Sequence, residues 1–327
     1  MRATRASRPR LLVLALALPA LLVGCTAEPS APGSPTATAP PSSVTSTPAV
    51  VPEQPPPAPR VSPEDVRVRT ATAAVRHLAG EIGPRPGTSP AYFRAAAWVE
   101  RRFTDLGWEV ERQRFPTPAG FSWVAPVPAG PSVNVIATRG DVRPGRPWLA
   151  VGAHLDTVPR APGAEDNASG VGVLLAVAEA LAGRRTRLPV VLVAFGSEEP
   201  RGTGDAHHHY GSRAYVASLT AAERRSLRGM VSLDRVGVGA AVPVGSPDLP
   251  SPLRDEVLAA ARRAGVPVLP ETGQVSSDHW SFAREGMPGV RLGSTPYAAY
   301  HDASDLPAVV DPAQLERTAR VVLAWVR

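Results

Sequence analysis

The sequence of 327 residues contains no lysine, so all 35 of its basic residues are arginines. Together with the abundance of alanine, proline, glycine and valine, this composition indicates a GC-rich codon pool. The formal charge of +6 includes Arg2, Arg5, Arg8 and Arg10, which lie in a segment that we expect to be removed, and without them the chain is nearly neutral. A basic surface for DNA or RNA therefore has little support, and we predict no nucleic-acid partner.

The chain also has a single cysteine, Cys25, which excludes an intrachain disulfide. It ends the stretch "MRATRASRPRLLVLALALPALLVGC", in which a basic segment precedes an apolar run too short for a comfortable membrane span, as in a secretory signal. The end "LVGC" resembles a bacterial lipobox. We therefore predict a signal peptide at residues 1–24, a lipid anchor on Cys25 and a location on the extracellular face of the bacterial cell membrane. The alternatives are an ordinary signal with an incidental cysteine, and release from the membrane.

Residues 25–62 are rich in proline, serine, threonine and alanine and have almost no aliphatic periodicity. Such a segment cannot bury enough apolar surface to fold, so we predict a disordered, extended tether. The remaining residues, 63–327, carry most of the 43% hydrophobic content and are long enough for one large domain.

Short apolar runs alternate with amphipathic stretches along residues 63–327. Ser62 and Pro63 predict the start of a helix, and Asp311 with Pro312 predict the start of the last one. Further helices are expected at about 91–106, 170–182 and 253–265, and strands at about 108–115, 134–138, 148–153, 189–195 and 230–233. This order predicts an α/β fold of three layers, with a mixed sheet between helices.

Three of the predicted strands run directly into acidic or imidazole side chains. "WLAVGA" is followed by His154, "PVVLVAF" by Glu198 and Glu199 after two residues, and "MVSL" by Asp234. In open α/β sheets, ligands bind just beyond the carboxyl ends of the strands. The sequence therefore predicts that these side chains meet at one edge of the sheet.

Histidine and carboxylate side chains together suit zinc or a similar divalent ion. Two such ions need one bridging carboxylate and further ligands on each side. The candidate ligands are His154, Asp166, Glu199, Asp234 and His301. Taken singly, each has a simpler reading: Asp166 or Asn167 could cap the following helix, the two glutamates could be a solvated pair, and His301 could be structural.

Across residues 65–327 the chain resembles the M28 family of zinc aminopeptidases. The resemblance rests on "HLD" at 154–156, "DNASG" at 166–170, "SEE" at 197–199, "SLD" at 232–234, "SDHWSF" at 277–282 and "YHDASD" at 300–305. Each tripeptide is weak alone, but the combined order is specific. The resemblance implies a zinc-exopeptidase fold and two divalent metal ions, with zinc as the expected metal.

The resemblance also implies a role for each site residue. Asp166 would bridge the two ions, His154 and Asp234 would complete one, and Glu199 and His301 the other. Glu198 would be the general base. Asp156 would accept the second N–H of the His154 imidazole, and Tyr300 would donate to the developing oxyanion. The peptide bond from Asp166 to Asn167 would be cis.

Several neighbouring residues are expected to stay outside this chemistry. Glu165 is interpreted as a solvated neighbour, and Asp278 and His279 as residues that stabilise a loop near the site. The segment "PRGTGDAHHHYGSRAY" is longer than the usual link of the family, and we interpret His207, His208 and His209 as part of a flexible, solvated rim.

The predicted function is that of a secreted, membrane-anchored exopeptidase with a dinuclear metal site that removes N-terminal amino acids from peptides. A glutaminyl cyclase-like enzyme and a carboxypeptidase of the same fold are the nearest alternatives. A surface protein that binds peptides without cleaving them is an alternative from a different class. The sequence does not reveal the preferred side chain of the substrate, the physiological metal or the oligomeric state.

Overall fold

The computed structural model of the chain describes residues 57–140 and 142–327. The predicted signal peptide, Cys25 with its predicted lipid anchor and most of the predicted tether therefore lie outside the described residues. In the described part, no helix combines the length and the apolar character that a membrane span requires.

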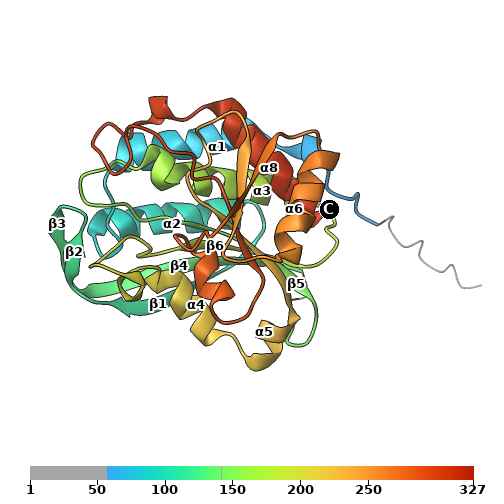
Figure 1. The fold of residues 1–327 in the computed structure, drawn as a ribbon, viewed down its shortest axis with the longest axis horizontal. Helices are drawn as coiled ribbons and strands as arrows, with labels where there is room; N and C mark the ends of the chain where they lie inside the picture. Colours follow the sequence, from blue (N-terminus) through green and yellow to red (C-terminus); the bar gives the residue numbers. More distant parts are fainter. Residues whose placement is uncertain (1–56, 141) are drawn as a thin grey trace, which may run out of the picture. The chain divides into compact units, whose positions relative to one another are not determined.

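The centre of the fold is a mixed sheet of eight strands in the order β1-β4-β6-β5-β7-β10-β8-β9 (Figure 1). Strands β6, β5, β7 and β10 run parallel to one another, whereas β1 and β4 pair antiparallel to their neighbours. Strand β8 pairs antiparallel with β10 and parallel with β9. The strands are β1 (Glu109–Thr117), β4 (Gly130–Arg139), β5 (Trp148–His154), β6 (Val190–Phe195), β7 (Leu227–Leu233), β8 (Val242–Ser246), β9 (Val268–Thr272) and β10 (Gly289–Leu292). A separate hairpin consists of β2 (Gly120–Ser122) and β3 (Ala125–Val127).

Helices cover both faces of this sheet, which confirms the predicted three-layer architecture (Figure 1). Because side chains alternate along a strand, β4 sends Val133, Val135 and Ala137 into the larger core and Ile136 into the smaller one. The larger core lies under α1 (Val68–Val75), α2 (Pro90–Asp105), α3 (Gly170–Leu181), α6 (Pro252–Arg263) and α8 (Pro312–Val326). The smaller core lies under α4 (Tyr210–Ser218) and α7 (His279–Ala283), and the short helix α5 (Ala221–Ser226) leads into β7.

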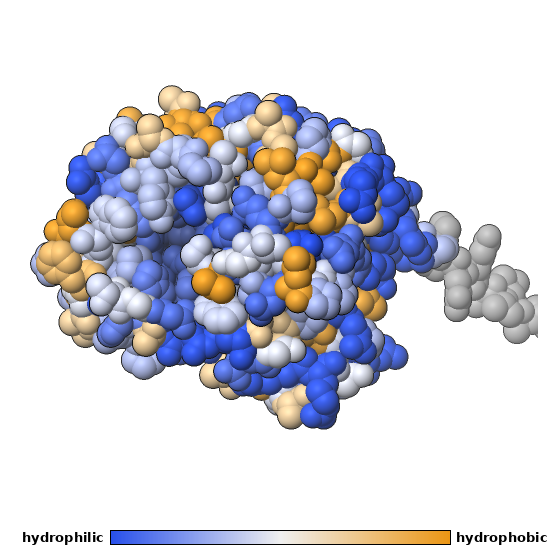
Figure 2. Space-filling view, in the orientation of Figure 1, coloured by the Kyte–Doolittle hydropathy of each residue, from blue (hydrophilic) through white to orange (hydrophobic). Residues whose placement is uncertain are grey.

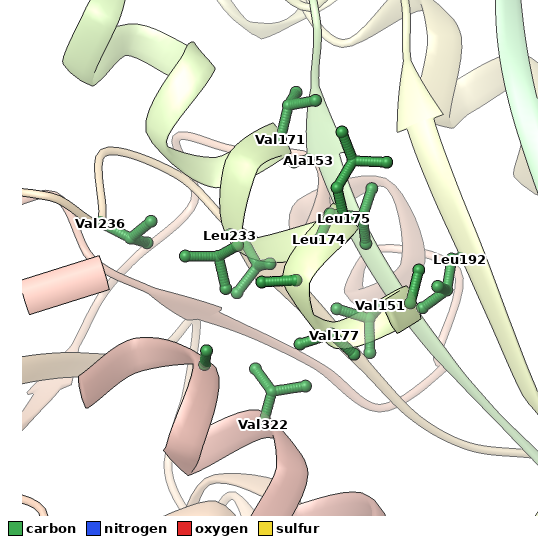
Figure 3. Close-up of a cluster of buried hydrophobic side chains, with 14 of the residues drawn as sticks. Val151, Ala153, Val171, Leu174, Leu175, Val177, Leu192, Leu233, Val236 and Val322 are labelled. Carbon is green, nitrogen blue, oxygen red and sulfur yellow. The ribbon is translucent and has the colours of Figure 1, made fainter. Parts of the chain in front are cut away.

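Helix α3 is buried on nearly all sides, as its sequence requires, because Glu179 is its only polar residue. In Figure 3, Leu174 and Val177 of this helix lie among Val151, Leu233 and Val322. Gly172 is needed here, because a Cβ at this position would lie 2.7 Å from the carbonyl oxygen of Ala71 in α1. Close packing of α1 on α3 therefore depends on this glycine. The packing holds α3, the helix that follows the predicted metal ligand Asp166.

The structure confirms the predicted helices at 91–106, 170–182 and 253–265 and all five predicted strands to within a few residues at their ends. It also confirms that Asp311 caps α8, since its side chain accepts a hydrogen bond from the N–H of Ala313. A helical turn starts at Pro63, as predicted, with Ser62 and Asp65 in a capping box. It is only the 3₁₀ turn η1 (Pro63–Asp65), and Val66 is extended before α1 begins.

Figure 2 shows one face of the molecule, which is mostly hydrophilic with scattered apolar groups. To the left of its centre this face is hollowed, and hydrophilic residues line the hollow.

Four further short helical segments lie between these elements: η2 (Arg76–Ile82), η3 (Ala164–Ser169), η4 (Asp205–His207) and η5 (Pro307–Val309).

Candidate metal centre

The five predicted metal ligands converge at the carboxyl end of the parallel strands. His154 is the last residue of β5, while Glu199 and Asp234 follow β6 and β7. Asp166 lies in η3, between β5 and α3, and His301 lies in the loop after β10. All five side chains are buried, with exposed fractions of 5% or less. Strand direction therefore brings together residues that are far apart in the sequence.

Asp166 lies between two histidines, and each of its carboxylate oxygens faces one of them. Oδ1 is 3.1 Å from Nε2 of His154, and Oδ2 is 3.2 Å from Nε2 of His301. Burial alone would raise the pKa of Asp166, but its contacts with the two histidines lower it well below its usual range. The peptide bond from Asp166 to Asn167 is cis, as expected.

Glu199 lies beside His301, and Asp234 lies beside His154. Nε2 of His301 is 3.4 Å from Oε2 of Glu199, and Nε2 of His154 is 3.8 Å from Oδ1 of Asp234. Donor atoms of His154, Asp166 and Glu199 all lie within 4.8 Å of one another. The same holds for His154, Glu198 and Asp234. The arrangement thus contains more than one position at which a cation could meet three donors.

The electrostatics of this cluster favour a bound cation. Burial, together with the charges of neighbouring carboxylates, raises the pKa of Glu198 and of Glu199 to about 8. Oε1 of Glu199 and Nδ1 of His301 are buried, and neither has a hydrogen-bond partner in the part of the chain that the structure describes. Imidazole nitrogens and carboxylate oxygens are the donors that zinc prefers, so the residues present fit a divalent-metal site.

Asp156 does not make the contact that was predicted for it. Its carboxylate is 3.9 Å from Nδ1 of His154, beyond hydrogen-bonding distance, and the imidazole instead contacts the backbone oxygen of Asp156 at 3.2 Å. The carboxylate accepts the N–H groups of Glu198 and Glu199 at 3.0 and 3.2 Å. Asp156 therefore fixes the turn that carries both glutamates.

Glu165 is not solvated, because its side chain is fully buried. Both of its carboxylate oxygens accept the N–H of Gly237, at 3.1 and 2.8 Å. Two further side chains of η3 hold the same loop: Asn167 accepts from Arg235 N–H and Ser169 from Val236 N–H. Asn167 also caps α3, since its Oδ1 accepts the N–H of Gly170 at 3.0 Å. The capping alternative thus holds for Asn167, while Asp166 faces the histidines.

The three consecutive histidines differ in their surroundings. His207 is exposed and His208 is partly buried, but only 3% of His209 is exposed. Nε2 of His209 lies 3.2 Å from Oε1 of Glu198, and burial lowers the pKa of His209. The interpretation of His209 as part of a solvated rim is therefore wrong. The sequence of three consecutive histidines does not by itself indicate which of them will be buried.

Asp278 and His279 lie near the site and are both fully buried. His279 contacts the backbone oxygen of Gln274 at 2.8 Å, which agrees with the predicted loop-stabilising role. Among the described residues, neither carboxylate oxygen of Asp278 has a hydrogen-bond partner. Burial and the negative charge of Glu198 raise the pKa of Asp278 to about 7.

Arg85 is a structural residue of the site that the sequence reasoning missed. It is fully buried, and burial lowers its pKa to about 10. Its guanidinium donates to the carbonyl oxygens of Leu78, Gly83, Leu155, Pro162 and Gly163. Arg85 therefore ties the end of β5 to the segment that leads into Asp166.

The donor cluster opens into a small pocket of about 120 Å³. Tyr300, which is 40% exposed, stacks on His301 with ring centroids 3.8 Å apart. Trp123, from the β2–β3 hairpin, contacts Tyr300 and His301 edge to face. The other lining residues that sequence reasoning did not identify are Pro200, Arg235 and Ser276.

The chain matches the model of "Peptidase family M28" over residues 134–326. YfbL of Escherichia coli K12, an uncharacterized protein, is 30% identical over 187 residues, which cover 54% of this chain and 52% of YfbL. Aminopeptidase YwaD of Bacillus subtilis is 32% identical over 142 residues, which cover 42% of this chain and 30% of YwaD. The chain thus spans about half the length, or less, of these curated relatives.

Solved structures show the same fold at low sequence identity. A zinc aminopeptidase from Bacillus subtilis superimposes with a TM-score of 0.70 at 18% identity, over 80% of this chain and 94% of that chain. A glutaminyl cyclase from Porphyromonas gingivalis superimposes with a TM-score of 0.68 at 21% identity, over 80% of this chain and 98% of that chain. The same fold therefore occurs in an aminopeptidase and in a glutaminyl cyclase, so the fold alone does not identify the activity. The activity must be argued from the side chains of the site.

Proposed function

The chain belongs to peptidase family M28, and from this premise we propose that it is a zinc-dependent aminopeptidase that releases N-terminal amino acids from peptides. The observation that carries the proposal is the position of Asp166, with one carboxylate oxygen directed at each of two histidines. A carboxylate so placed suits a bridge between two cations.

In this proposal Asp166 would contribute to the binding of both zinc ions. His154 and Asp234 would help to hold one ion, and Glu199 and His301 the other. Zinc at these positions would polarise the scissile carbonyl and lower the pKa of the attacking water.

Glu198 is the proposed general base. Its Oε2 lies 4.0 Å from Nε2 of His154, and its side chain lines the same pocket as the ligands. Asp156 fixes the position of Glu198 by accepting its backbone N–H. Glu198 would take the proton of the attacking water and pass it to the leaving amine, so one carboxylate serves both halves of the reaction.

Tyr300 is the proposed donor to the oxyanion. It lines the pocket and is held by stacking on His301, a proposed ligand. A donor that is fixed before the reaction stabilises the developing negative charge without reorganisation.

The test is hydrolysis of aminoacyl p-nitroanilides by the zinc-loaded protein. We expect activity that stops on chelation, and a loss of about a hundred- to ten-thousand-fold in kcat for Glu198→Gln with zinc content unchanged. Full activity of Glu198→Gln would refute the mechanism. Shortening of a blocked peptide from its carboxyl end would show a carboxypeptidase instead, and peptide binding without turnover would show a binding protein.

Glutaminyl cyclase activity is the second candidate, because the fold is shared with the cyclase from Porphyromonas gingivalis. Cyclisation of a peptide that begins with glutamine, measured together with the number of zinc ions per chain, separates the two. One ion with cyclisation supports the cyclase, and two ions with amino-acid release support the aminopeptidase.

We also propose that the protein is exported and anchored through a lipid on Cys25. The support is the sequence alone: the signal-like segment, the lipobox-like "LVGC" and the proline-rich tether that follows. Fractionation of cells that express the wild type and Cys25→Ser tests this. Wild-type protein is expected with the membranes, and an unchanged distribution of the variant would contradict the anchor.

A further inference from the structure

Arg235 follows the proposed ligand Asp234 and lines the same pocket as His154, Glu199 and His301. Its side chain is only 15% exposed, although it carries a permanent charge. Nε lies 3.5 Å from Oδ1 of Asp234, and the guanidinium carbon lies 4.6 Å from the ring centroid of Tyr300. A cation at the mouth of a pocket that should already hold metal ions requires an explanation.

The backbone of Arg235 is held in one position by the segment around Asp166. Arg235 has a φ of 55°, in the left-handed region that a non-glycine residue rarely adopts. Its own N–H and those of Val236 and Gly237 are accepted by Asn167, Ser169 and Glu165 in turn. Three buried side chains thus fix the backbone of this loop, and the contacts with Asp234 and Tyr300 restrict the side chain of Arg235 before any substrate binds.

The guanidinium of Arg235 retains unused donors. The ion pair with Asp234 is made through Nε, and no hydrogen bond of either terminal amino group is found among residues 57–140 and 142–327. Two nearby arginines differ in this respect. Arg201 donates from both terminal groups to Pro118, Pro128 and Thr88, and Arg291 donates from both to Ser276 and Gln274. Those two are structural, whereas Arg235 lines the pocket and makes no such hydrogen bonds with its terminal groups in the described part of the chain.

A role as mere counter-charge for Asp234 explains this arrangement poorly. Such a role would direct the fork at the carboxylate, which is the geometry that arginine prefers. Here the Nε edge faces Asp234, and the aromatic ring of Tyr300 supports the plane of the guanidinium. The pair of terminal N–H groups therefore remains for a ligand that arrives from the pocket.

We propose that Arg235 is a specificity-determining residue that binds a carboxylate of the substrate, so that the enzyme favours short peptides with an acidic group next to the scissile bond. The inference rests on the proposed aminopeptidase function. Planar, bidentate recognition of a carboxylate is the chemistry for which a fixed arginine fork is best suited. The acidic group is either the side chain of an N-terminal glutamate or aspartate, or the α-carboxylate of a dipeptide.

Two substrate pairs distinguish these sources. Glutamyl p-nitroanilide against leucyl p-nitroanilide tests the acidic side chain, and Leu-Gly against Leu-Gly-amide tests the α-carboxylate. The zinc-loaded full chain is compared with Arg235→Met, whose stem can still cover Tyr300, and with Arg235→Lys, which keeps the charge without the fork. Arg160→Met is the control, because Arg160 pairs with Asp302, next to His301, and lies outside the pocket lining.

We expect the wild type to prefer the acidic member of one pair, and Arg235→Met to reduce that preference about ten- to a hundred-fold, mainly through KM. Arg235→Lys should retain an intermediate preference, and Arg160→Met should retain it fully. The proposal is overturned if the wild type prefers neither acidic member, or if the preference persists in Arg235→Met. In either case hydrolysis of leucyl p-nitroanilide by the wild type would leave the aminopeptidase assignment standing, whereas inactivity on every substrate would refute that assignment itself.

Discussion

The imidazole Nε2 of His209 lies 3.2 Å from Oε1 of Glu198, and both side chains are buried. On its other side Glu198 faces Nε2 of His154 at 4.0 Å. Because burial lowers the pKa of His209, this histidine is expected to be neutral beside the carboxyl group of Glu198. The contact would hold the proposed base in a single orientation toward the site.

Removal of this contact should slow the reaction without preventing substrate binding. We expect His209→Ala to lower kcat about tenfold with little change in KM, because the base is less well oriented. His209→Gln should retain more activity, since its amide can still donate to Glu198. The control is His207→Ala, in the same segment but exposed. Steady-state kinetics on one aminoacyl substrate measure all three, and equal kcat in the two His209 variants and the wild type would contradict the role.

Metal removal should destabilise the protein. Four carboxylates, those of Asp166, Glu198, Glu199 and Asp234, are buried close together, and ions that bind only the folded state stabilise it by mass action. At a zinc concentration about a hundred times the Kd this amounts to about 3 kcal/mol, or about 5 to 10 °C in Tm for a domain of this size.

Thermal unfolding with and without chelator measures this shift, and elemental analysis of the purified protein gives the number of ions. Two zinc ions per chain are expected. Asp166→Asn should lose most of the zinc-dependent rise in Tm, whereas Glu198→Gln should keep it. A Tm that is independent of zinc in the wild type would count against a resident metal.

Arg85 should be irreplaceable even by lysine. Its guanidinium reaches five carbonyl oxygens, and an ammonium group at the end of a lysine cannot match that geometry. We expect Arg85→Lys to lower the free energy of unfolding by about 2 to 4 kcal/mol, because buried acceptors lose their donors. Urea denaturation measures the loss. Arg101→Lys on the exposed side of α2 is the matched control, and a similar small effect in both variants would disprove the structural role.

The residues of the site that the sequence could predict are those whose position follows from strand direction. His154, Glu199 and Asp234 each come at or shortly after a continuous apolar run, and parallel strands end at the same edge. The apolar runs were readable because β5, β6 and β7 are buried on both faces. By contrast, β8, β9 and β10 contain at most five residues each, and so short a run shows no clear period.

The contacts that the sequence could not predict depend on where a second segment passes. Asp156 was expected to bind the imidazole two residues away, but the backbone of the neighbouring strand end presents two N–H groups to it. Glu165 and Arg85 are charged residues, which composition alone places in solvent. Their burial is compensated by hydrogen bonds with backbone groups of distant loops. The local sequence around each residue does not indicate which distant loops will contact it.

The buried carboxyl of Asp278 should make stability depend on pH. Its pKa is raised to about 7 in the folded state by burial and then by Glu198, while His154 and His209 oppose the shift. In the unfolded state an aspartate ionises near pH 4. Between about pH 4 and 7 the carboxyl group is therefore ionised in the unfolded state but protonated in the folded state, and the free energy of unfolding falls as the pH rises.

Asp278→Asn removes this ionisation. In chelator-treated protein, the stability gained by the variant over the wild type should therefore be larger at pH 8 than at pH 5, by about 2 to 3 kcal/mol, since each pKa unit is worth about 1.4 kcal/mol. Urea unfolding at the two pH values measures the difference, with Asp255→Asn on the exposed side of α6 as the control for the loss of one carboxylate. If Asp278→Asn raises the free energy of unfolding by the same amount at both pH values, Asp278 is already ionised at pH 5. A positive charge or a hydrogen-bonded water must then stabilise its carboxylate.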